Sequence, residues 1–141
     1  MDDLRLSVED DPDGADVRFL DDRLYEFNAA RTGIHDGQLL AVWRRDDGGA
    51  IVGGLHGWTW GGWLEVRVLW VHEDTRGQGL GRRLLEAAEA EALRRGCHSC
   101  LLDTHTFQSP AFYLRLGYEE VASVDGYPAA NQRHYFRKRL H

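Results

Sequence analysis

The chain has 141 residues, of which 43% are hydrophobic and 28% are charged, and its formal net charge is −6 at pH 7. This length and composition are typical of one globular domain, which we place over residues 1–141. The negative charge argues against a non-specific nucleic-acid-binding protein, and no apolar run approaches the roughly 20 residues that a membrane-spanning helix needs.

The first residues, "MDDLRLSVEDD", lack the positive segment and apolar core of a signal peptide, so we expect a cytoplasmic protein. The acidic residues of this region are expected mainly to keep the protein soluble, although they could also steer a cationic substrate. The two cysteines, Cys97 and Cys100, form one C-x-x-C pair, which offers too few ligands for a zinc site. We expect buried or half-buried free thiols and no bound metal.

The first half of the chain predicts one strand, one helix and a three-stranded antiparallel meander. Residues 4–9, "LRLSVE", are expected to form a strand. A helix follows, because Pro12 and several acids suit its start, apolar residues recur at helical spacing, and Gly33 ends it. The meander has strands at 38–45, 50–60 and 63–71, joined by the hairpin signals "DDGG" and "GG".

The second half predicts a long helix, a strand, a short helix and two closing strands. The long helix would bury one face and end near Gly96, with Arg95 placed to pair with Glu91. The later elements are a strand at 97–105, a helix from near Pro110, and strands at 118–124 and 133–140. The strands on either side of the long helix should be parallel, which gives a mixed α/β sheet with helices on its faces.

A glycine-rich turn joins the third meander strand to the long helix. The segment "TRGQGLGRR" lacks the Lys-Ser/Thr of a P-loop and misplaces the third glycine of a dinucleotide fingerprint. It fits the pattern R-x-x-G-x-G formed by Arg76, Gly79 and Gly81. The amides of a helix start have no intrahelical partners and lie at the positive end of the helix dipole, so the sequence predicts an anion site.

This segment resembles the acyl-CoA-binding motif of the GNAT superfamily of N-acetyltransferases, and "FQSPAFYLRLGYEEV" is similar to the late helix of the same superfamily. The order of the elements matches over nearly the whole chain. The resemblance implies a mostly antiparallel sheet of six to seven strands flanked by helices. His72-Glu73 departs from the pattern, since many relatives have a proline after the strand.

The resemblance also implies site residues. Backbone amides of Gln78, Gly79, Gly81 and Arg82 would hold the pyrophosphate of acetyl-CoA, within a contact loop that also includes Arg76, Gly77 and Leu80. The third meander strand would bind the pantetheine arm through Leu69, Trp70 and Val71, and a free N–H of Leu69 or Val71 would polarise the thioester oxygen. Tyr113 matches the general acid of the family, although helix spacing alone would make it a core aromatic. Gln108 would set a turn or contact CoA.

The general base is less clearly indicated. Glu65 lies where some members of the family carry a glutamate base, and we expect its apolar neighbours to desolvate it partly. Strict alternation would put Glu65, Arg67 and Leu69 on one face and Val66, Val68 and Trp70 on the other. A surface ion pair of Glu65 is the simpler alternative. Weaker candidates for the base are His56, His72, Asp103 and His105.

Five tryptophans lie on or beside the meander, and we expect most of them to pack across strands, with Trp58 or Trp60 as possible acceptor contacts. These features together predict an acetyl-CoA-dependent N-acetyltransferase that acts without metal, by direct attack of a primary amine in a ternary complex. A catalytically inactive CoA-binding module is the main alternative, and transfer of a larger acyl group or O-acylation is another. Exposed closing strands such as "RHYFRKRL" could support a homodimer.

Overall fold

The computed structural model describes residues 4–141, which divide into one unit up to His35 and a second from Asp36 to His141. In the first unit, helix α1 (Gly14–Thr32) begins where the Asp13 side chain accepts the Ala15 N–H and ends at Gly33, whose φ is 73°. The predicted helix is therefore confirmed. The strand predicted at residues 4–9 is wrong: its apolar residues are exposed and no neighbouring strand pairs with it, and a lone strand is not stable.

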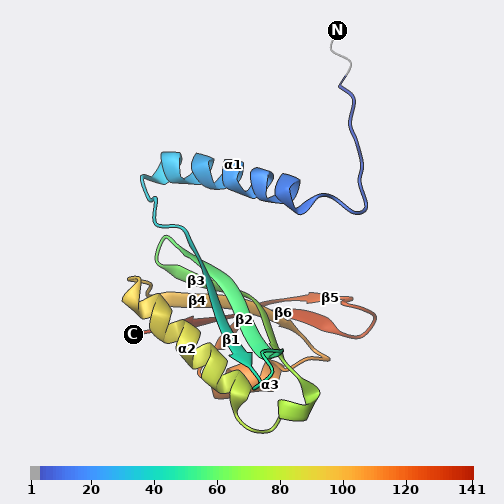
Figure 1. Cartoon of the computed structure of the whole chain (residues 1–141), viewed down its shortest axis with the longest axis vertical. Helices are drawn as coiled ribbons and strands as arrows, with labels where there is room; N and C mark the ends of the chain where they lie inside the picture. Colours follow the sequence, from blue (N-terminus) through green and yellow to red (C-terminus); the bar gives the residue numbers. More distant parts are fainter. Residues whose placement is uncertain (1–3) are drawn as a thin grey trace. The chain divides into compact units, whose positions relative to one another are not determined.

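The second unit is built on a six-stranded sheet in the order β1-β2-β3-β4-β6-β5, in which β3 and β4 pair in parallel and the other neighbours are antiparallel (Figure 1). The strands are β1 (Gln38–Arg45), β2 (Ile51–Trp60), β3 (Trp63–Val71), β4 (Ser99–His105), β5 (Glu119–Asp125) and β6 (Gln132–Arg139). The helical segments of this unit are η1 (Glu73–Thr75), α2 (Leu80–Arg94) and α3 (Pro110–Arg115). The predicted fold class is confirmed.

The two edges of the sheet are β1 and β5. Strand β6 lies between β4 and β5, so the prediction that "RHYFRKRL" forms an exposed edge is wrong. The last connection of the chain returns β6 to the inside of the sheet, an arrangement that local sequence patterns do not encode. Within residues 4–141, no helix combines the length and apolarity needed to cross a membrane.

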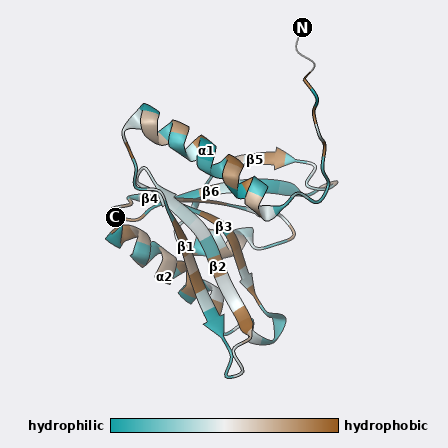
Figure 2. Cartoon of the chain, turned by 45° about the horizontal axis from the view of Figure 1, so that its top comes forward, coloured by the Kyte–Doolittle hydropathy of each residue, from teal (hydrophilic) through white to brown (hydrophobic). Residues whose placement is uncertain are grey.

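Helix α2 covers one face of the sheet and buries the predicted apolar stripe. Leu84, Leu85, Ala88 and Ala92 are buried against strand residues that include Leu55, Leu64, Val66, Leu102 and Phe136. Figure 2 shows the matching brown, apolar segments on β3. The core therefore lies between α2 and this face of the sheet.

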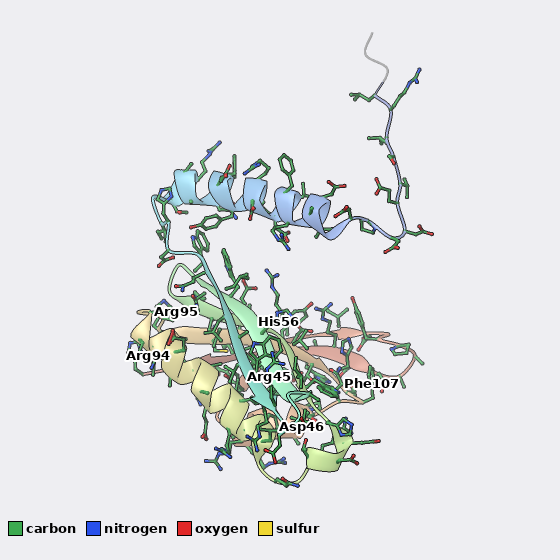
Figure 3. The ribbon with its side chains drawn as sticks, in the orientation of Figure 1. Arg45, Asp46, His56, Arg94, Arg95 and Phe107 are labelled. Carbon is green, nitrogen blue, oxygen red and sulfur yellow. The ribbon has the colours of Figure 1, made fainter. Side chains whose placement is uncertain are left out.

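The end of α2 is tied to the first two strands. Arg94 and Arg95, labelled in Figure 3, both pair with Glu91, and the predicted Glu91–Arg95 pair is confirmed at 3.1 Å. Arg95 Nη1 also donates to Leu39 O and to Thr59 Oγ1, both at 3.0 Å. The polar end of the helix thus fixes its position on β1 and β2.

Where β2 and β3 pair, from Gly53–Val71 to Trp60–Trp63, β3 contributes one residue more than β2. His56 pairs with Val68 and Gly57 pairs with Val66, which leaves Arg67 as the extra residue of a β-bulge. Gly57 allows this close approach, because a Cβ there would overlap the carbonyl oxygen of Glu65. The bulge exchanges the faces to which the side chains of β3 point.

The bulge corrects the alternation predicted for β3. Val66 packs in the core below α2, but beyond the bulge it is Leu69 and Val71 that pack against the core. Val68 and Trp70 are exposed and line a groove on the face opposite α2. The prediction that Leu69 shares a face with Glu65 is therefore wrong.

The parallel strands β3 and β4 separate halfway along. They pair only at Trp63–Ser99, Leu64–Cys100 and Glu65–Leu101, and no pairing continues beyond these residues. The bulge begins where the pairing ends. The second half of β3 therefore keeps an edge that faces β4 without bonding to it.

Candidate active site

The loop between β3 and α2 is shaped by two glycines with left-handed backbone. Gly77 has φ 78° and Gly79, the N-cap of α2, has φ 77°. The first helical hydrogen bond runs from Arg83 N–H to Gly79 O, so the N–H groups of Leu80, Gly81 and Arg82 have no intrahelical acceptor. The N-cap residue, Gly79, has no side chain that could accept a hydrogen bond from these amides. Such a set of amides at the positive end of a helix can hold an anion.

Arg76 joins this loop to the end of β3. Its Nε donates to Val71 O at 3.0 Å, which holds the start of the loop against the strand. Arg82 is exposed, and its Nε donates to Glu86 at 2.7 Å along the helix. The Glu86 carboxylate raises the pKa of the Arg82 guanidinium by this hydrogen bond. Of the two arginines, Arg76 is the one that shapes the loop.

The third glycine of the motif, Gly81, accommodates the late helix. A Cβ at Gly81 would lie 3.4 Å from Cζ of Phe112, at the short end of ordinary van der Waals contact. Phe112 is the residue before Tyr113 on α3, and the two rings meet edge to face with centroids 5.1 Å apart. Helix α3 therefore packs directly against the start of α2.

Tyr113 is buried, with 8% of its surface exposed. Burial raises the pKa of its phenol to about 12. Among the described residues, the Tyr113 hydroxyl makes no hydrogen bond. Every fully buried side-chain oxygen or nitrogen in this part of the chain does have a hydrogen-bond partner. The Tyr113 hydroxyl is therefore not fully buried and reaches the surface of the protein. The phenol is a protonated donor at neutral pH.

The backbone of β3 beyond the bulge offers two N–H groups to the gap between β3 and β4. His72 N–H donates to Val52 O at 2.8 Å. Because donors alternate along an antiparallel ladder, the N–H groups of Leu69 and Val71 then point away from β2, toward the gap. At the end of β3, the Trp70 ring packs edge to face against the ring of His72.

A pocket of about 290 Å³ lies where β3 and β4 separate. Its polar lining consists of Glu65, Arg67, Asp103, Arg133 and Tyr135. Glu65 is exposed, so the prediction that its neighbours desolvate it is wrong: the strands part beside it and leave it open. Within residues 4–141 neither Glu65 nor Arg67 has an ion-pair partner within 4 Å, so the ion-pair alternative for Glu65 is not formed.

One wall of the pocket is an ion pair between strands. Arg133 on β6 donates from Nε to Asp103 on β4 at 2.8 Å, which raises the pKa of the arginine. Its guanidinium also lies over the rings of Tyr135 and Tyr127, 5.2 and 5.7 Å from their centroids. Asp103 is thereby committed to Arg133, which makes it a weak candidate for a base.

Gln108 sets the turn that follows β4. Its Oε1 accepts the backbone N–H of His105 at 2.7 Å and the hydroxyl of Thr104 at 3.1 Å, and lies 3.1 Å from His105 Nδ1. Since the backbone donor identifies this atom as the oxygen, His105 Nδ1 is the donor in this contact. The His105 ring stacks on Phe107, labelled in Figure 3.

Two other weak candidates for the base, His72 and His56, lie outside the pocket between β3 and β4. His72 caps the short helix η1, because its Nδ1 accepts the Asp74 N–H at 3.0 Å. His56, labelled on β2 in Figure 3, lines the apolar groove together with Trp43, Val68 and Trp70. Trp58 is opposite Glu65 in the β2–β3 register, so its suggested contact with an acceptor stays a prediction.

Both cysteines are free and buried, as predicted. Burial raises the pKa of the Cys100 thiol to about 12, so it is no nucleophile at neutral pH. Among the residues that the structure describes, no cluster of His, Cys, Asp and Glu side chains is arranged to bind a metal ion.

The sequence alone did not point to Arg67, Arg133 and Tyr135 as pocket residues. Arg133 and Tyr135 alternate on β6 and could have been placed on one face, but only the β4–β6 register sets them beside Asp103. Arg67 was expected merely as a neighbour of Glu65. The only feature of the sequence that indicates the bulge at Arg67 is Gly57, the glycine on the neighbouring strand β2.

The structure thus combines a parted parallel strand pair with an amide-lined helix start, and comparison with known proteins identifies the family that shares this fold. Residues 36–120 match the profile of the acetyltransferase (GNAT) domain. An acetyltransferase of Agrobacterium fabrum is 34% identical over 137 residues, which cover 97% of this chain and 100% of that protein. Blasticidin-S acetyltransferase of Streptomyces morookaense is 39% identical over 104 residues, 73% of this chain and 76% of that one.

A solved structure supports the same assignment. An acetyltransferase from Bacillus cereus superposes with a TM-score of 0.77 at 27% identity, over 94% of this chain and 97% of that one. The chain belongs to the GNAT acetyltransferase family. It is an acyl-CoA-dependent N-acetyltransferase, and enzymes of this family use acetyl-CoA and an acceptor substrate.

Proposed function

We propose that this enzyme transfers an acetyl group from acetyl-CoA to a primary amine of a small molecule or peptide, by direct attack in a ternary complex in the cytoplasm. The observation that carries the proposal is the set of N–H groups without intrahelical acceptors at the start of α2, beside a strand whose edge is free. Acetyl-CoA would supply an acetyl group activated as a thioester.

We assign the binding residues to this loop and to the end of β3. The amides of Gln78, Gly79, Gly81 and Arg82 hold the diphosphate, and Arg76 keeps their loop against Val71. Contacts to the co-substrate would come from the strand end Leu69, Trp70 and Val71, from Gly77 and Leu80 in the loop, and from Gln108 and Tyr113. The N–H of Leu69 or Val71 donates to the thioester oxygen and stabilises its developing negative charge.

Two side chains move protons. Glu65 accepts a proton from the amine, directly or through one water, so that the nitrogen can form a bond to the carbonyl carbon. The carbon–sulfur bond breaks, and Tyr113 donates its phenolic proton to the leaving sulfur. The second proton of the attacking nitrogen is released through water and restores the phenol of Tyr113, which leaves a neutral amide and free CoA thiol. The phenol keeps this proton at neutral pH because its pKa is raised to about 12.

Titration calorimetry with CoA, followed by measurement of thiol release across a panel of amines, tests the proposal. We expect saturable CoA binding and amine-dependent thiol release. Failure of CoA to bind at millimolar concentration would overturn the whole proposal. Binding without release from any amine would indicate the inactive CoA-binding module instead, and a preference for longer acyl-CoAs or for alcohols would change the reaction assigned.

The proposed homodimer would use the edge strand β5. All residues of β5 are exposed, including Val121 and Val124, and an exposed edge is a common place for strand pairing between chains. Light scattering at several protein concentrations measures the mass directly. A monomer at all concentrations would contradict this part of the proposal.

A further inference from the structure

We propose that the acceptor is an amine that also carries a carboxylate, such as a free amino acid, held between Glu65 and Arg67. This inference rests on the proposed function and names its substrate class. The pocket where β3 and β4 separate contains two acidic and two basic side chains, Glu65, Asp103, Arg67 and Arg133. Its formal charge is therefore balanced, unlike that of the whole chain, which is −6.

The four charges differ in how they are satisfied. Asp103 and Arg133 neutralise each other at 2.8 Å across β4 and β6. In the described part of the chain, Glu65 and Arg67 make no ion pair with each other or with any other side chain. One negative and one positive group thus remain for a ligand that carries both charges.

The backbone places these two groups as a pair. Glu65 and Arg67 are two residues apart on one strand and line the same pocket, so their Cα atoms are at most about 7 Å apart. This distance lets two long side chains reach the opposite ends of a small zwitterion. Arg67 is the extra residue of the bulge, and bulges commonly redirect one side chain next to an active site.

The charges of the pocket also disfavour two other classes of acceptor, diamines and peptides. A diamine would meet Arg67 with like charge, and the first residue of a peptide lacks a free α-carboxylate. An amino acid can place its ammonium against Glu65, the carboxylate proposed to accept the proton, and its carboxylate against the fork of donors of Arg67. The ring of Tyr135 and the side chain of Leu101 leave an apolar wall for the rest of the molecule.

Matched acceptors test this inference. We would measure kcat/KM for α-, β- and γ-amino acids and for the carboxamide of each one. The wild-type enzyme should prefer the acid that fits best over its amide by about 10- to 100-fold, the usual value of a hydrogen-bonded charge. Arg67→Gln should remove this preference and change kcat/KM for the amide by less than about threefold.

A control variant separates the pocket from general charge effects. Arg137 lies on β6 outside the pocket and pairs with Glu119 at 2.8 Å, so Arg137→Gln should leave the preference intact. Transfer to amines without any preference for the carboxylate would overturn this inference alone, as would equal losses for acid and amide in Arg67→Gln. Absence of CoA binding or of transfer to every amine would overturn the proposed function as well.

Discussion

The Tyr113 ring is fixed by aromatic neighbours, so its hydroxyl can be removed without disturbing the core. Tyr118 and Phe136 lie 5.9 and 6.1 Å from it, centroid to centroid, in addition to Phe112. We expect Tyr113→Phe to lower kcat by about 100-fold or more, as loss of a general acid does, and to leave the Kd for CoA within about twofold. Steady-state kinetics and calorimetry check both values.

The pH dependence of the same variant is a further check. Because the pKa of Tyr113 is raised to about 12, the wild-type kcat should not decline through loss of this proton below about pH 11. A decline near pH 10 that disappears in Tyr113→Phe would contradict the assigned ionisation. An unchanged kcat in the variant would remove Tyr113 from the mechanism.

Cys100 should make the folded protein sensitive to alkaline pH. Its thiol has a pKa near 9 when exposed and about 12 in the folded protein, since burial disfavours the thiolate. Between these values the unfolded chain releases a proton that the folded chain keeps, so its stabilising effect is complete below pH 9 and is lost as the pH rises toward 12. We expect the free energy of unfolding to fall by about 1 kcal/mol from this group between pH 8 and 10.

Urea titrations of the wild type and of Cys100→Ala at pH 8 and pH 10 measure this effect. The variant has a smaller core side chain and is expected to be less stable at both pH values, so the comparison concerns the difference between the two pH values. That difference should be smaller in the variant by about 1 kcal/mol. Equal pH dependence in both proteins would show that the thiol ionises without unfolding.

At the scale of elements, the loop before α2 depends on its left-handed glycines. A Cβ at Gly79 would meet nothing within 4 Å, so Gly79→Ala adds only backbone strain, about 1–2 kcal/mol. We expect this strain to move the loop and to weaken CoA binding by about tenfold. Calorimetry with CoA checks the affinity.

Gly49 offers a matched control for that variant. It lies in the β1–β2 hairpin with φ 88°, and a Cβ there would also meet nothing within 4 Å. Gly49→Ala should lower the free energy of unfolding by a similar amount while CoA affinity stays unchanged. If both variants bound CoA as tightly as the wild type, the loop amides would not be the anchor.

The bulge in β3 depends on Gly57. An alanine Cβ at Gly57 would overlap the Glu65 carbonyl oxygen and lie 3.1 Å from Val66 Cα, both backbone atoms that cannot move aside. We expect Gly57→Ala to cost about 2–3 kcal/mol of stability and to lower activity, because the pocket is built on this register. Chemical unfolding and kinetics give the two numbers.

Gly54 is the comparison for this site. Its added Cβ would lie 2.8 Å from the Trp43 ring, a half-exposed side chain that can rotate away. Gly54→Ala should therefore be less destabilising than Gly57→Ala. The reverse order would mean that the bulge tolerates a side chain and is not held by glycine.

At the scale of the whole molecule, the parted sheet should be visible in amide hydrogen exchange. The N–H groups of Val68 and Trp70 point toward β2 and should exchange slowly, whereas those of Leu69 and Val71 face the gap and should exchange faster. Bound CoA should slow exchange at Leu69, Val71, Gly81 and Arg82. Residue-resolved NMR provides this test, and equal protection of all four strand amides in the free protein would contradict the separation of β3 from β4.

Much of the fold could be predicted from the sequence because its signals are local. The "DDGG" and "GG" turns fix the meander, and glycines end the helices at Gly33 and Gly96. The strand expected at residues 4–9 was wrong because alternation of apolar residues is only half of what a strand needs. The other half is a partner, and a partner is a non-local property.

The candidate site divides in the same way. The loop from Arg76 to Arg82 could be predicted, since glycine conformation and free helix amides depend on neighbours in the chain. The pocket could not, because Arg133 and Tyr135 reach it only through the pairing of β6 with β4. The run from Leu64 to Val71 is apolar or β-branched at most positions, so it hides the change of face at Arg67.

The single supernumerary residue on β3 has a consequence for how this protein can evolve. If β3 kept Arg67 but lost the bulge, uninterrupted alternation would drive Trp70 toward the space below α2 that Leu69 and Val71 now fill. Deleting Arg67 would restore alternation with Leu69 and Val71 still facing α2. Point substitutions can retune this region one side chain at a time. Loss of Arg67 would instead remove the bulge and the arginine of the pocket in one event, so homologues without this residue should keep the interior and differ at the opening.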